Sequence, residues 1–185
     1  MEEHLNQTFT LLKQGKTLLY PTDTVYGLGC DATNFEAVKK IYQLKQREES
    51  KALICLVSDV KMLEKYIETV PETAYQIIET ALKPTTIIYD NPIGVATNLI
   101  AADQTLAIRI IHSGFAHNLI KKFGKPIVST SANISGEPTP KTFNEISPQI
   151  LKDVDYVVNL PCETNTKPST IIKLSNTGEV KIIRE

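Results

Sequence analysis

The chain has 185 residues, of which 42% are hydrophobic and 22% charged, and its formal net charge is −1. This length suits one domain with a substantial hydrophobic core, or at most two small ones. The balanced charge excludes a global basic field, so any tight contact with nucleic acid would have to come from a local patch.

Up to Val57 the chain predicts helices and strands in alternation around one long polar loop. Gly15 is an apt C-terminal cap for the first helix, and a Thr33-x-x-Glu36 capping box opens the second. Pro21 ends the first strand. In order, we expect a helix over 5–14, a strand over 17–20, a loop over 21–31, a helix over 33–44 and a strand buried on both faces over 52–57.

Beyond Val57 the alternation continues, and the chain closes with a hairpin. In order, we expect helices begun at Ser58 and Pro71, a strand over 85–89, loops over 91–103, a strand over 106–111, a helix over 113–124, a strand over 127–128 leading into a loop over 129–136, a short helix opened by Thr142-x-x-Glu145 and limited by Pro148, a strand over 156–159, and hairpin strands over 170–174 and 180–183. This succession predicts one α/β domain over 1–185, with a sheet of mixed direction and helices packed against it.

The cysteines and the N-terminus bear on where the protein works. Cys30, Cys55 and Cys162 are far apart and include no C-x-x-C pair, which supports neither a disulfide framework nor a zinc ribbon. We therefore expect free thiols in a reducing compartment. The polar N-terminus lacks a signal-peptide pattern, and no apolar run approaches the roughly 20 residues that a membrane helix needs. These features predict a cytoplasmic protein without a membrane segment.

Several kinds of active site lack their residue patterns in this sequence. His4, His112 and His117 have no metal-binding spacing, so we interpret them as surface or packing residues and expect no metal held by the protein. A G-x-S-x-G elbow is absent, which argues against a Ser-His-Asp hydrolase. Neither a Walker loop nor a G-x-G-x-x-G fingerprint occurs, so phosphate binding would need another kind of cradle.

Cations in two places are candidates for binding an anion. Lys45, Arg47 and Lys51 follow the second predicted helix, and they form either a solvated helix end or a clamp for phosphate. Arg109 lies in a predicted apolar strand, where a charge is costly unless it is paired. Either a structural ion pair or a substrate carboxylate would satisfy it.

Two stretches hold most of the small polar side chains, and both follow predicted strands. These are 21–31 and 129–136, and strand ends are where α/β folds commonly bind ligands. The side chains of Ser129, Ser131 and Asn133 either hold a turn through bonds to the backbone or form a polar cradle for phosphate or adenosine. We expect the two stretches to face each other across one cleft.

These stretches resemble the YrdC-like family, also called TsaC, and the resemblance runs from Leu18 to Arg184. Its carriers are Pro21-Thr22-Asp23-Thr24-Val25-Tyr26-Gly27-Leu28, Lys45-x-Arg47 with Lys51, Leu106-Ala107-Ile108-Arg109, Ser129-Thr130-Ser131-Ala132-Asn133-Ile134-Ser135-Gly136-Glu137-Pro138-Thr139 and Pro168-Ser169-Thr170. The resemblance implies a single-domain YrdC-like fold, a twisted mixed sheet with a concave basic groove. It also implies a threonylcarbamoyl-AMP synthase, which converts L-threonine, bicarbonate and ATP to threonylcarbamoyl-adenylate and pyrophosphate for N6-threonylcarbamoyladenosine formation in tRNA.

The same resemblance implies roles for individual residues. For ATP these are Arg47, Lys51, Thr105, Ser131, Asn133, Thr139 and Arg184. For L-threonine they are Thr24, Arg109, Ser129 and Ser169. The implied catalytic cations are Lys45, Arg47 and Lys51. Threonine's own amine would capture CO2 or bicarbonate, so positioning and charge stabilisation would suffice, with Mg2+ carried mainly by the phosphates.

The chain departs from the family pattern at four places near the expected ATP site. Glu48 and Ala52 stand where the family usually has Pro, Ile111 replaces the Pro of an R-I-P motif, and Leu82-Lys83-Pro84 replaces P-G-P. These changes alter loop stiffness, which bears on nucleotide affinity. The chain ends at Glu185 and resembles the short form of the family, without the C-terminal domain of longer members.

Two other functions remain as alternatives. One is a module that binds double-stranded RNA or tRNA, or acts in ribosome maturation, and the net charge and few aromatic residues weigh against this as the sole role. The other is a carbamoyl-transfer domain of the kind found in hydrogenase maturation proteins, which occurs in longer chains with zinc-finger-like cysteines. For the leading hypothesis, the resemblance suggests a TsaD-type transferase complex as the partner that receives the adenylate.

Overall fold

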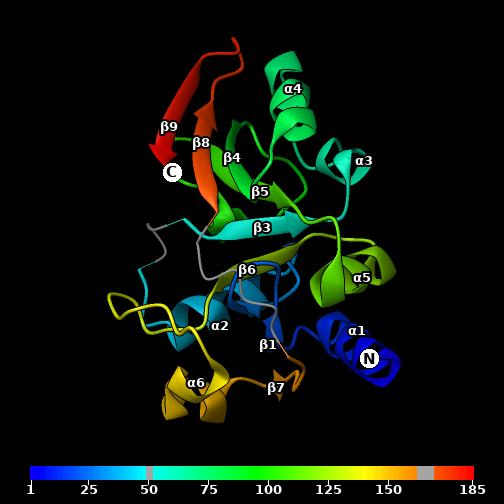
Figure 1. Ribbon diagram of the computed structural model, residues 1–185, viewed down its shortest axis with the longest axis vertical. Coiled ribbons are helices and arrows are strands. Elements are labelled where there is room, and N and C mark those ends of the chain that lie inside the picture. Colours follow the sequence, from blue (N-terminus) through cyan, green and yellow to red (C-terminus); the bar gives the residue numbers. More distant parts are fainter. Residues whose placement is uncertain (49–51, 162–168) are drawn as a thin grey trace.

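The protein is an α/β structure built on one mixed sheet. A computed structural model describes residues 1–48, 52–161 and 169–185. In these ranges nine strands join in the order β7-β1-β2-β6-β3-β5-β4-β8-β9. They are β1 (Leu18–Pro21), β2 (Tyr26–Gly29), β3 (Ile54–Val57), β4 (Thr85–Asp90), β5 (Thr105–Ile110), β6 (Ile127–Ser131), β7 (Tyr156–Val157), β8 (Thr170–Leu174) and β9 (Val180–Arg184). Figure 1 shows the sheet running from β7 at the bottom to β9 at the top.

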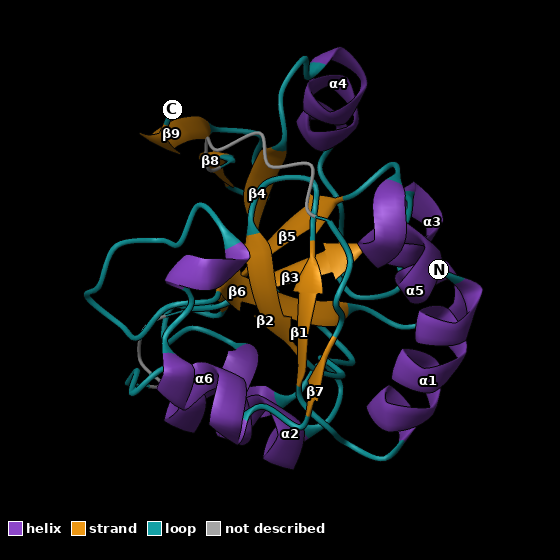
Figure 2. Ribbon diagram, turned by 60° about the horizontal axis from the view of Figure 1, so that its bottom comes forward, coloured by secondary structure: helices purple, strands orange, loops and turns teal. Residues whose placement is uncertain are grey.

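Helices flank the sheet, as the sequence predicted. In the described ranges they are α1 (Glu2–Lys13), α2 (Phe35–Leu44), α3 (Val60–Leu63), α4 (Glu72–Thr80), α5 (Gly114–Phe123), α6 (Pro148–Asp153) and the 3-10 turns η1 (Thr97–Leu99) and η2 (Phe143–Glu145). Figures 1 and 2 show α1, α3 and α5 together on one side, and α2 and α6 toward the end that carries β7. None of the helices in these ranges is long and apolar enough to cross a lipid bilayer.

The centre of the sheet is apolar because its strands have neighbours on both edges and cover on both faces. β3 pairs in parallel with β5 and antiparallel with β6. Cys55, Leu56 and Val57 are fully buried there. A continuous apolar run is what such a strand requires, so the prediction of a buried strand within 52–57 is confirmed. The terminal hairpin of β8 and β9 is confirmed as well.

One predicted loop contains a strand. The sequence predicted a loop over 21–31, within which Gly27 and Gly29 would permit turns or close approach of a ligand, yet β2 pairs antiparallel with β1 and with β6. A Cβ on Gly29 would lie 2.1 Å from the carbonyl oxygen of Val128 and 2.7 Å from the ring of Tyr20. A Cβ on Gly27 would lie 3.1 Å from the Ser129 hydroxyl oxygen. These glycines allow close packing within the sheet, which sequence alone does not distinguish from a turn.

The second polar stretch also begins inside a strand. The sequence predicted a loop from Ser129, but β6 continues to Ser131. The reason is that β6 has partners on both sides at this point, since Ser131 pairs with Gly27 of β2 and Ser129 pairs with Ile54 of β3. The loop therefore starts at Ala132, and Ser129, Thr130 and Ser131 are held by pairing within the sheet.

Two helix caps differ from those predicted by one position. Asn34 caps α2 in place of Thr33, and Asp59 caps α3 in place of Ser58, each by accepting a bond from a main-chain N–H of the first turn. The Thr33 hydroxyl donates to Asp31 at 2.7 Å, and the Ser58 hydroxyl donates to Asp59 at 2.8 Å. Neighbouring residues that can both cap compete for the position, and here the residue nearer the helix prevails.

The chain around Pro148 differs from the prediction in a similar way. The Thr142-x-x-Glu145 pattern gives only the 3-10 turn η2, where the Thr142 hydroxyl donates to the Glu145 carboxylate at 3.1 Å. Pro148 limits no helix there and instead begins α6, with Ser147 as the N-cap. The fixed φ of proline suits the first position of a helix, so this residue marks a start where the sequence analysis placed an end.

Candidate active site

A cavity of about 550 Å³ opens on one face of the central sheet. Both polar stretches contribute to its wall, through the β1–β2 turn and the end of β6, as the sequence predicted. β8 and β9 from the C-terminal hairpin add to it. Eight of the predicted site residues line this cavity, namely Thr24, Arg47, Arg109, Ser129, Ser131, Thr139, Ser169 and Arg184.

The alternation of side chains along β5 decides which residues reach this cavity. Ala107 and Arg109 line it, whereas Ile108 and Ile110 line a second cavity. Successive side chains of a strand point to opposite faces of the sheet, so the two cavities lie on opposite faces of β5. Arg109 is thus the one charged residue of β5, and it lies on the face whose cavity also includes polar residues such as Thr24 and Ser129.

The β1–β2 turn is held by one hydroxyl group. Oγ1 of Thr22 donates to the carbonyl of Val25 at 2.7 Å and accepts from the N–H groups of Thr24 at 3.1 Å and Val25 at 3.2 Å. These bonds fix the backbone between the two strands. They place Thr24, which is only 4% exposed, in the cavity wall.

Arg109 is buried, and the structure partly satisfies its charge. Its side chain is 5% exposed, and Nη2 donates to Oδ1 of Asp23 at 2.9 Å. Nε is also buried but finds no acceptor among the described residues. Burial lowers the pKa of Arg109 below its ordinary value, and the negative charge of Asp23 opposes that shift. A buried donor without a partner is costly, so a further acceptor that reached Nε of Arg109 would be bound favourably.

Ser169 and Arg184 are fixed to each other near the end of the chain. Nε and Nη2 of Arg184 donate to the carbonyl of Ser169 at 3.1 and 2.8 Å. The Ser169 hydroxyl shares a 2.8 Å hydrogen bond with Thr86 of β4. Burial lowers the pKa of Arg184, and the nearby positive charge of Arg109 lowers it further. The guanidinium groups of Arg109 and Arg184 therefore lie close together in the wall of the same cavity.

The charges of the cavity wall are all of one sign in the part of the chain that the structure describes. Arg47, Arg109, Lys141 and Arg184 line it, and no acidic residue does. Such a wall attracts polyanions. It offers none of the carboxylates with which proteins usually hold Mg2+. Among the described residues, no group of three or more His, Cys, Asp or Glu side chains could hold a metal ion.

Lys45 and Asn133 lie behind the wall. The Lys45 side chain is buried, and its ammonium donates to the carbonyls of Ser131 at 2.6 Å and Asn133 at 2.7 Å and to Oδ1 of Asn133 at 3.3 Å. The Ser131 hydroxyl donates to the same Oδ1. Neither Lys45 nor Asn133 lines the cavity, in contrast to the expectation that both complete the groove. They reach it only through Ser131.

Two more predicted residues are not among those that the cavity brings together. Thr105 begins β5 and does not line the cavity. Its hydroxyl donates to Asp103 at 2.6 Å. Lys51 lies outside the described residues. The wall also contains Lys141, which the sequence analysis missed although it follows Thr139 by two positions. The position of Lys141 so close to Thr139, a predicted ATP contact, could have indicated its place in the wall.

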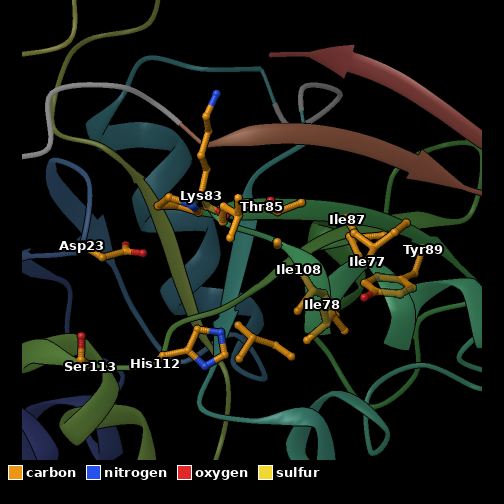
Figure 3. Close-up of a pocket in the computed structure, with 14 residues that line it drawn as sticks. Asp23, Ile77, Ile78, Lys83, Thr85, Ile87, Tyr89, Ile108, His112 and Ser113 are labelled. Carbon is orange, nitrogen blue, oxygen red and sulfur yellow. Dashed lines mark hydrogen bonds between the residues drawn. The ribbon is translucent and has the colours of Figure 1, made fainter.

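The second cavity has a volume of about 270 Å³ and differs in character. Figure 3 shows Ile77, Tyr89 and neighbouring apolar side chains at one end, and Asp23 with His112 at the other. Its floor is largely apolar, and it lies beneath α4. Asp23 thus lines this cavity while its carboxylate bonds to Arg109 of the first.

Comparisons with known proteins agree with the resemblance. The model of the family Sua5/YciO/YrdC, described as "Telomere recombination", matches residues 10–185. A protein of Pseudoalteromonas translucida named threonylcarbamoyl-AMP synthase is 37% identical over 166 residues, which covers 88% of this chain and 88% of that protein. One of Vibrio vulnificus with the same name is 30% identical over 174 residues, covering 92% and 94%.

A solved structure gives a match in three dimensions. The crystal structure of P. abyssi Sua5 complexed with L-threonine superposes with a TM-score of 0.87 and 28% identity. The match covers 94% of this chain and 52% of that chain, so this chain spans about half the length of that Sua5 protein. The predicted fold is confirmed by this likeness.

Proposed function

The chain belongs to the Sua5/YciO/YrdC family, whose model matches residues 10–185, and on this premise we propose that it is a threonylcarbamoyl-AMP synthase. It would join L-threonine, bicarbonate and ATP, and release pyrophosphate. One observation carries the proposal, namely that Arg109 lies buried, with Nε unpaired, in the wall of a cavity whose charged residues, among those described, are all cationic. A guanidinium in this state suits a carboxylate, the group that every amino-acid substrate brings.

The threonine end of the proposed site is the region around Arg109. In the proposal its guanidinium binds the threonine carboxylate, and Thr24, Ser129 and Ser169 surround the rest of the amino acid. All three hydroxyl residues are buried to more than nine-tenths. Buried hydroxyls favour a substrate with polar groups of its own, so threonine is better suited than an apolar amino acid of the same size.

The ATP end is the cationic part of the wall. In the proposal Arg47, Arg184 and Lys141 neutralise the phosphates and the Thr139 hydroxyl donates a hydrogen bond, while the Ser131 hydroxyl, whose proton goes to Asn133, contacts ATP as an acceptor. Lys51 remains a predicted contact, and so does Thr105. Lys45 and Asn133 act indirectly, because they hold the carbonyl and hydroxyl of Ser131 from behind. Mg2+ would arrive with the phosphates of ATP, since the described wall has no carboxylate to hold it.

The chemistry needs no nucleophile from the protein. The free amine of threonine bonds to the carbon of CO2 and loses a proton, or bonds to the carbon of bicarbonate with loss of water, and either route gives a carbamate. An oxygen of this carbamate then bonds to the α-phosphorus of ATP, and the bond to the leaving pyrophosphate breaks. The cations stabilise charge that builds up on the phosphates, and the buried wall holds the two reactants in contact.

The proposal extends to the setting of the reaction. We include a single domain over 1–185, the cytoplasmic location predicted from the cysteines, and a TsaD-type transferase that takes the adenylate to tRNA. RNA binding as the main role is less well supported, because the relatives reported above carry the name of the synthase.

Release of pyrophosphate tests this function. The purified protein is incubated with ATP, and pyrophosphate is measured with both L-threonine and bicarbonate, with each alone and with neither. The proposal predicts release only when both are present. Replacing L-threonine with L-serine tests whether the enzyme discriminates by the side-chain methyl group. Release that ignores threonine, or none in any mixture, contradicts the proposal.

A further inference from the structure

We propose that Asp23 is a positioning residue for the threonine site, which holds Arg109 from behind so that the free edge of its guanidinium faces the substrate. This inference rests on the proposed function, because it gives Arg109 the task of binding the substrate carboxylate. It adds Asp23, from the β1–β2 turn, as a second residue on which binding of the carboxylate depends.

The contact itself is the first observation. Oδ1 of Asp23 accepts from Nη2 of Arg109 at 2.9 Å, and these residues are 86 positions apart in the chain. The Arg109 side chain is 5% exposed and that of Asp23 is 25% exposed, so the pair is partly shielded from water. Hydrogen bonds between charged groups in such places are stronger than those between neutral ones.

The two residues lie on different cavities. Arg109 lines the larger cavity, and Asp23 does not. Asp23 lines the smaller one on the other face of β5, where Figure 3 shows its carboxylate opposite the apolar end. The carboxylate that meets the guanidinium thus comes from a residue that lines the smaller cavity and is not part of the substrate-cavity wall. It occupies Nη2 and leaves Nε without an acceptor among the described residues.

An orienting partner helps an arginine to bind a carboxylate. Its guanidinium is a planar fork at the end of a flexible chain, and paired hydrogen bonds form only when the plane is correctly turned. A bond from behind fixes this plane before the substrate arrives. The substrate then does not have to order the side chain, which favours binding.

Asp23 is itself held in place. It is the second residue of the β1–β2 turn that the Thr22 hydroxyl closes through bonds to Val25 and to the N–H of Thr24. Thr24, the next residue, lines the substrate cavity. One rigid turn therefore sets two things at once, the position of a hydroxyl in the threonine site and the direction of the guanidinium.

Two substitutions at Asp23 test this role. Asp23→Ala removes the acceptor, and Asp23→Asn keeps an oxygen acceptor of similar shape without the charge. Steady-state turnover is measured while threonine and ATP are varied separately. We expect Asp23→Ala to raise the KM for threonine about ten- to hundred-fold, as for the loss of a hydrogen bond between charged groups, and Asp23→Asn to raise it less. The KM for ATP should change by no more than about two-fold, within the usual effect of a remote polar change.

Asp155→Asn is the matched control. Asp155 also pairs with a cation, Lys16, at 3.1 Å, and its side chain is 26% exposed. It precedes the edge strand β7, accepts bonds from Thr17 just before the start of β1, and does not line the substrate cavity. This change should lower the melting temperature and leave the KM for threonine unaltered. The melting temperatures of all variants are recorded without ligand. If Asp23→Ala does not fold, Asp23→Asn decides.

The outcomes distinguish failure of the positioning role of Asp23 from failure of the proposed function. If the unaltered protein requires threonine but both Asp23 variants keep its KM for threonine, the positioning role is wrong and the function stands. If the variants lose stability while both KM values shift together, Asp23 is only structural and the inference is also wrong. If the unaltered protein shows no threonine dependence, the proposed function fails and this inference falls with it.

Discussion

The ammonium of Lys45 donates to the main-chain carbonyl of Ser131 at 2.6 Å, beneath the wall of the candidate active site. The same group donates to the carbonyl of Asn133 at 2.7 Å. Lys45 follows the last residue of α2, so it fastens the end of this helix to the end of β6. The family resemblance implies a catalytic role for Lys45, and in the structure this residue supports the wall of the candidate site from behind.

The protonation of Lys45 should affect stability in a defined pH range. Burial, with the nearby charge of Arg47, lowers the pKa of Lys45 from 10.5 to about 8. Below pH 8 both the folded and the unfolded chain hold this proton. Between pH 8 and 10.5 the folded chain releases it and the unfolded chain keeps it, so stability gains with rising pH.

This gain is measured against a Lys45→Met variant, which cancels the titration of other groups. Urea unfolding at several pH values should show the free energy of unfolding of the unaltered protein improving relative to the variant, by up to about 1.4 kcal/mol per pH unit. The variant itself should be less stable at neutral pH, because it leaves the Ser131 and Asn133 carbonyls without their donor. A difference that stays constant with pH would mean that Lys45 keeps its ordinary pKa.

Gly29 and Gly27 should respond differently to replacement by alanine. Gly29→Ala would bring a Cβ to 2.1 Å from the backbone oxygen of Val128, which cannot move without breaking the sheet. We expect a loss of at least about 3 kcal/mol or failure to fold. Gly27→Ala meets side chains at 3.1 Å, those of Thr22 and Ser129, which can shift.

For Gly27→Ala we therefore expect a folded protein with a raised KM for threonine. Circular dichroism and thermal melting compare the two variants, and turnover is then measured on those that fold. Equal stability of both variants would show that β2 does not pack as closely against β6 as the structure has it.

Arg109 tolerates neither loss of charge nor loss of shape in this account. Arg109→Ala should abolish threonine-dependent turnover and leave the protein folded, because Asp23 is exposed enough to regain water. Arg109→Lys should also lose most activity, since an ammonium cannot offer two parallel donors. ATP binding, measured by calorimetry, should persist in both. Turnover at the unaltered level in Arg109→Ala would remove this residue from the site.

Arg184 and Lys141 should separate the two substrates. Arg184 lines the cavity and also fixes the carbonyl of Ser169, so Arg184→Ala should raise the KM for both ATP and threonine. Lys141 lines the cavity and, among the residues that the structure describes, makes no hydrogen bond to the proposed threonine-site residues, so Lys141→Ala should raise the KM for ATP alone. Each change should amount to several-fold, as for a single charge contact with a phosphate. A threonine effect in Lys141→Ala would contradict this division.

The features that could be predicted from the sequence have local causes. The apolar run of β3 reflects burial of that strand, whereas the hairpin follows from its local turn, since β9 is exposed throughout; both elements were predicted correctly. Arg109 was also noticeable from the sequence, because a single charge in an apolar strand requires a partner. The structure supplies one partner, Asp23, and leaves Nε for another.

The features that sequence reasoning missed depend on contacts between distant segments. The glycines of β2 are needed because Val128 lies against Gly29 and Ser129 against Gly27, and both of these residues are about 100 positions away on β6. Lys45 and Arg47 are two positions apart in one motif, yet only Arg47 lines the cavity. Between them Gln46 has φ +49, and this left-handed residue turns the chain at the end of α2.

The identity of the product tests the central claim most directly. The protein is incubated with ATP, L-threonine and 13C-labelled bicarbonate, and the mixture is analysed at once by mass spectrometry, because an acyl-type adenylate hydrolyses readily. The account predicts threonylcarbamoyl-AMP that carries the label, formed in step with pyrophosphate and absent when Arg109 is replaced by alanine. Pyrophosphate or AMP formed without any labelled adenylate would contradict it.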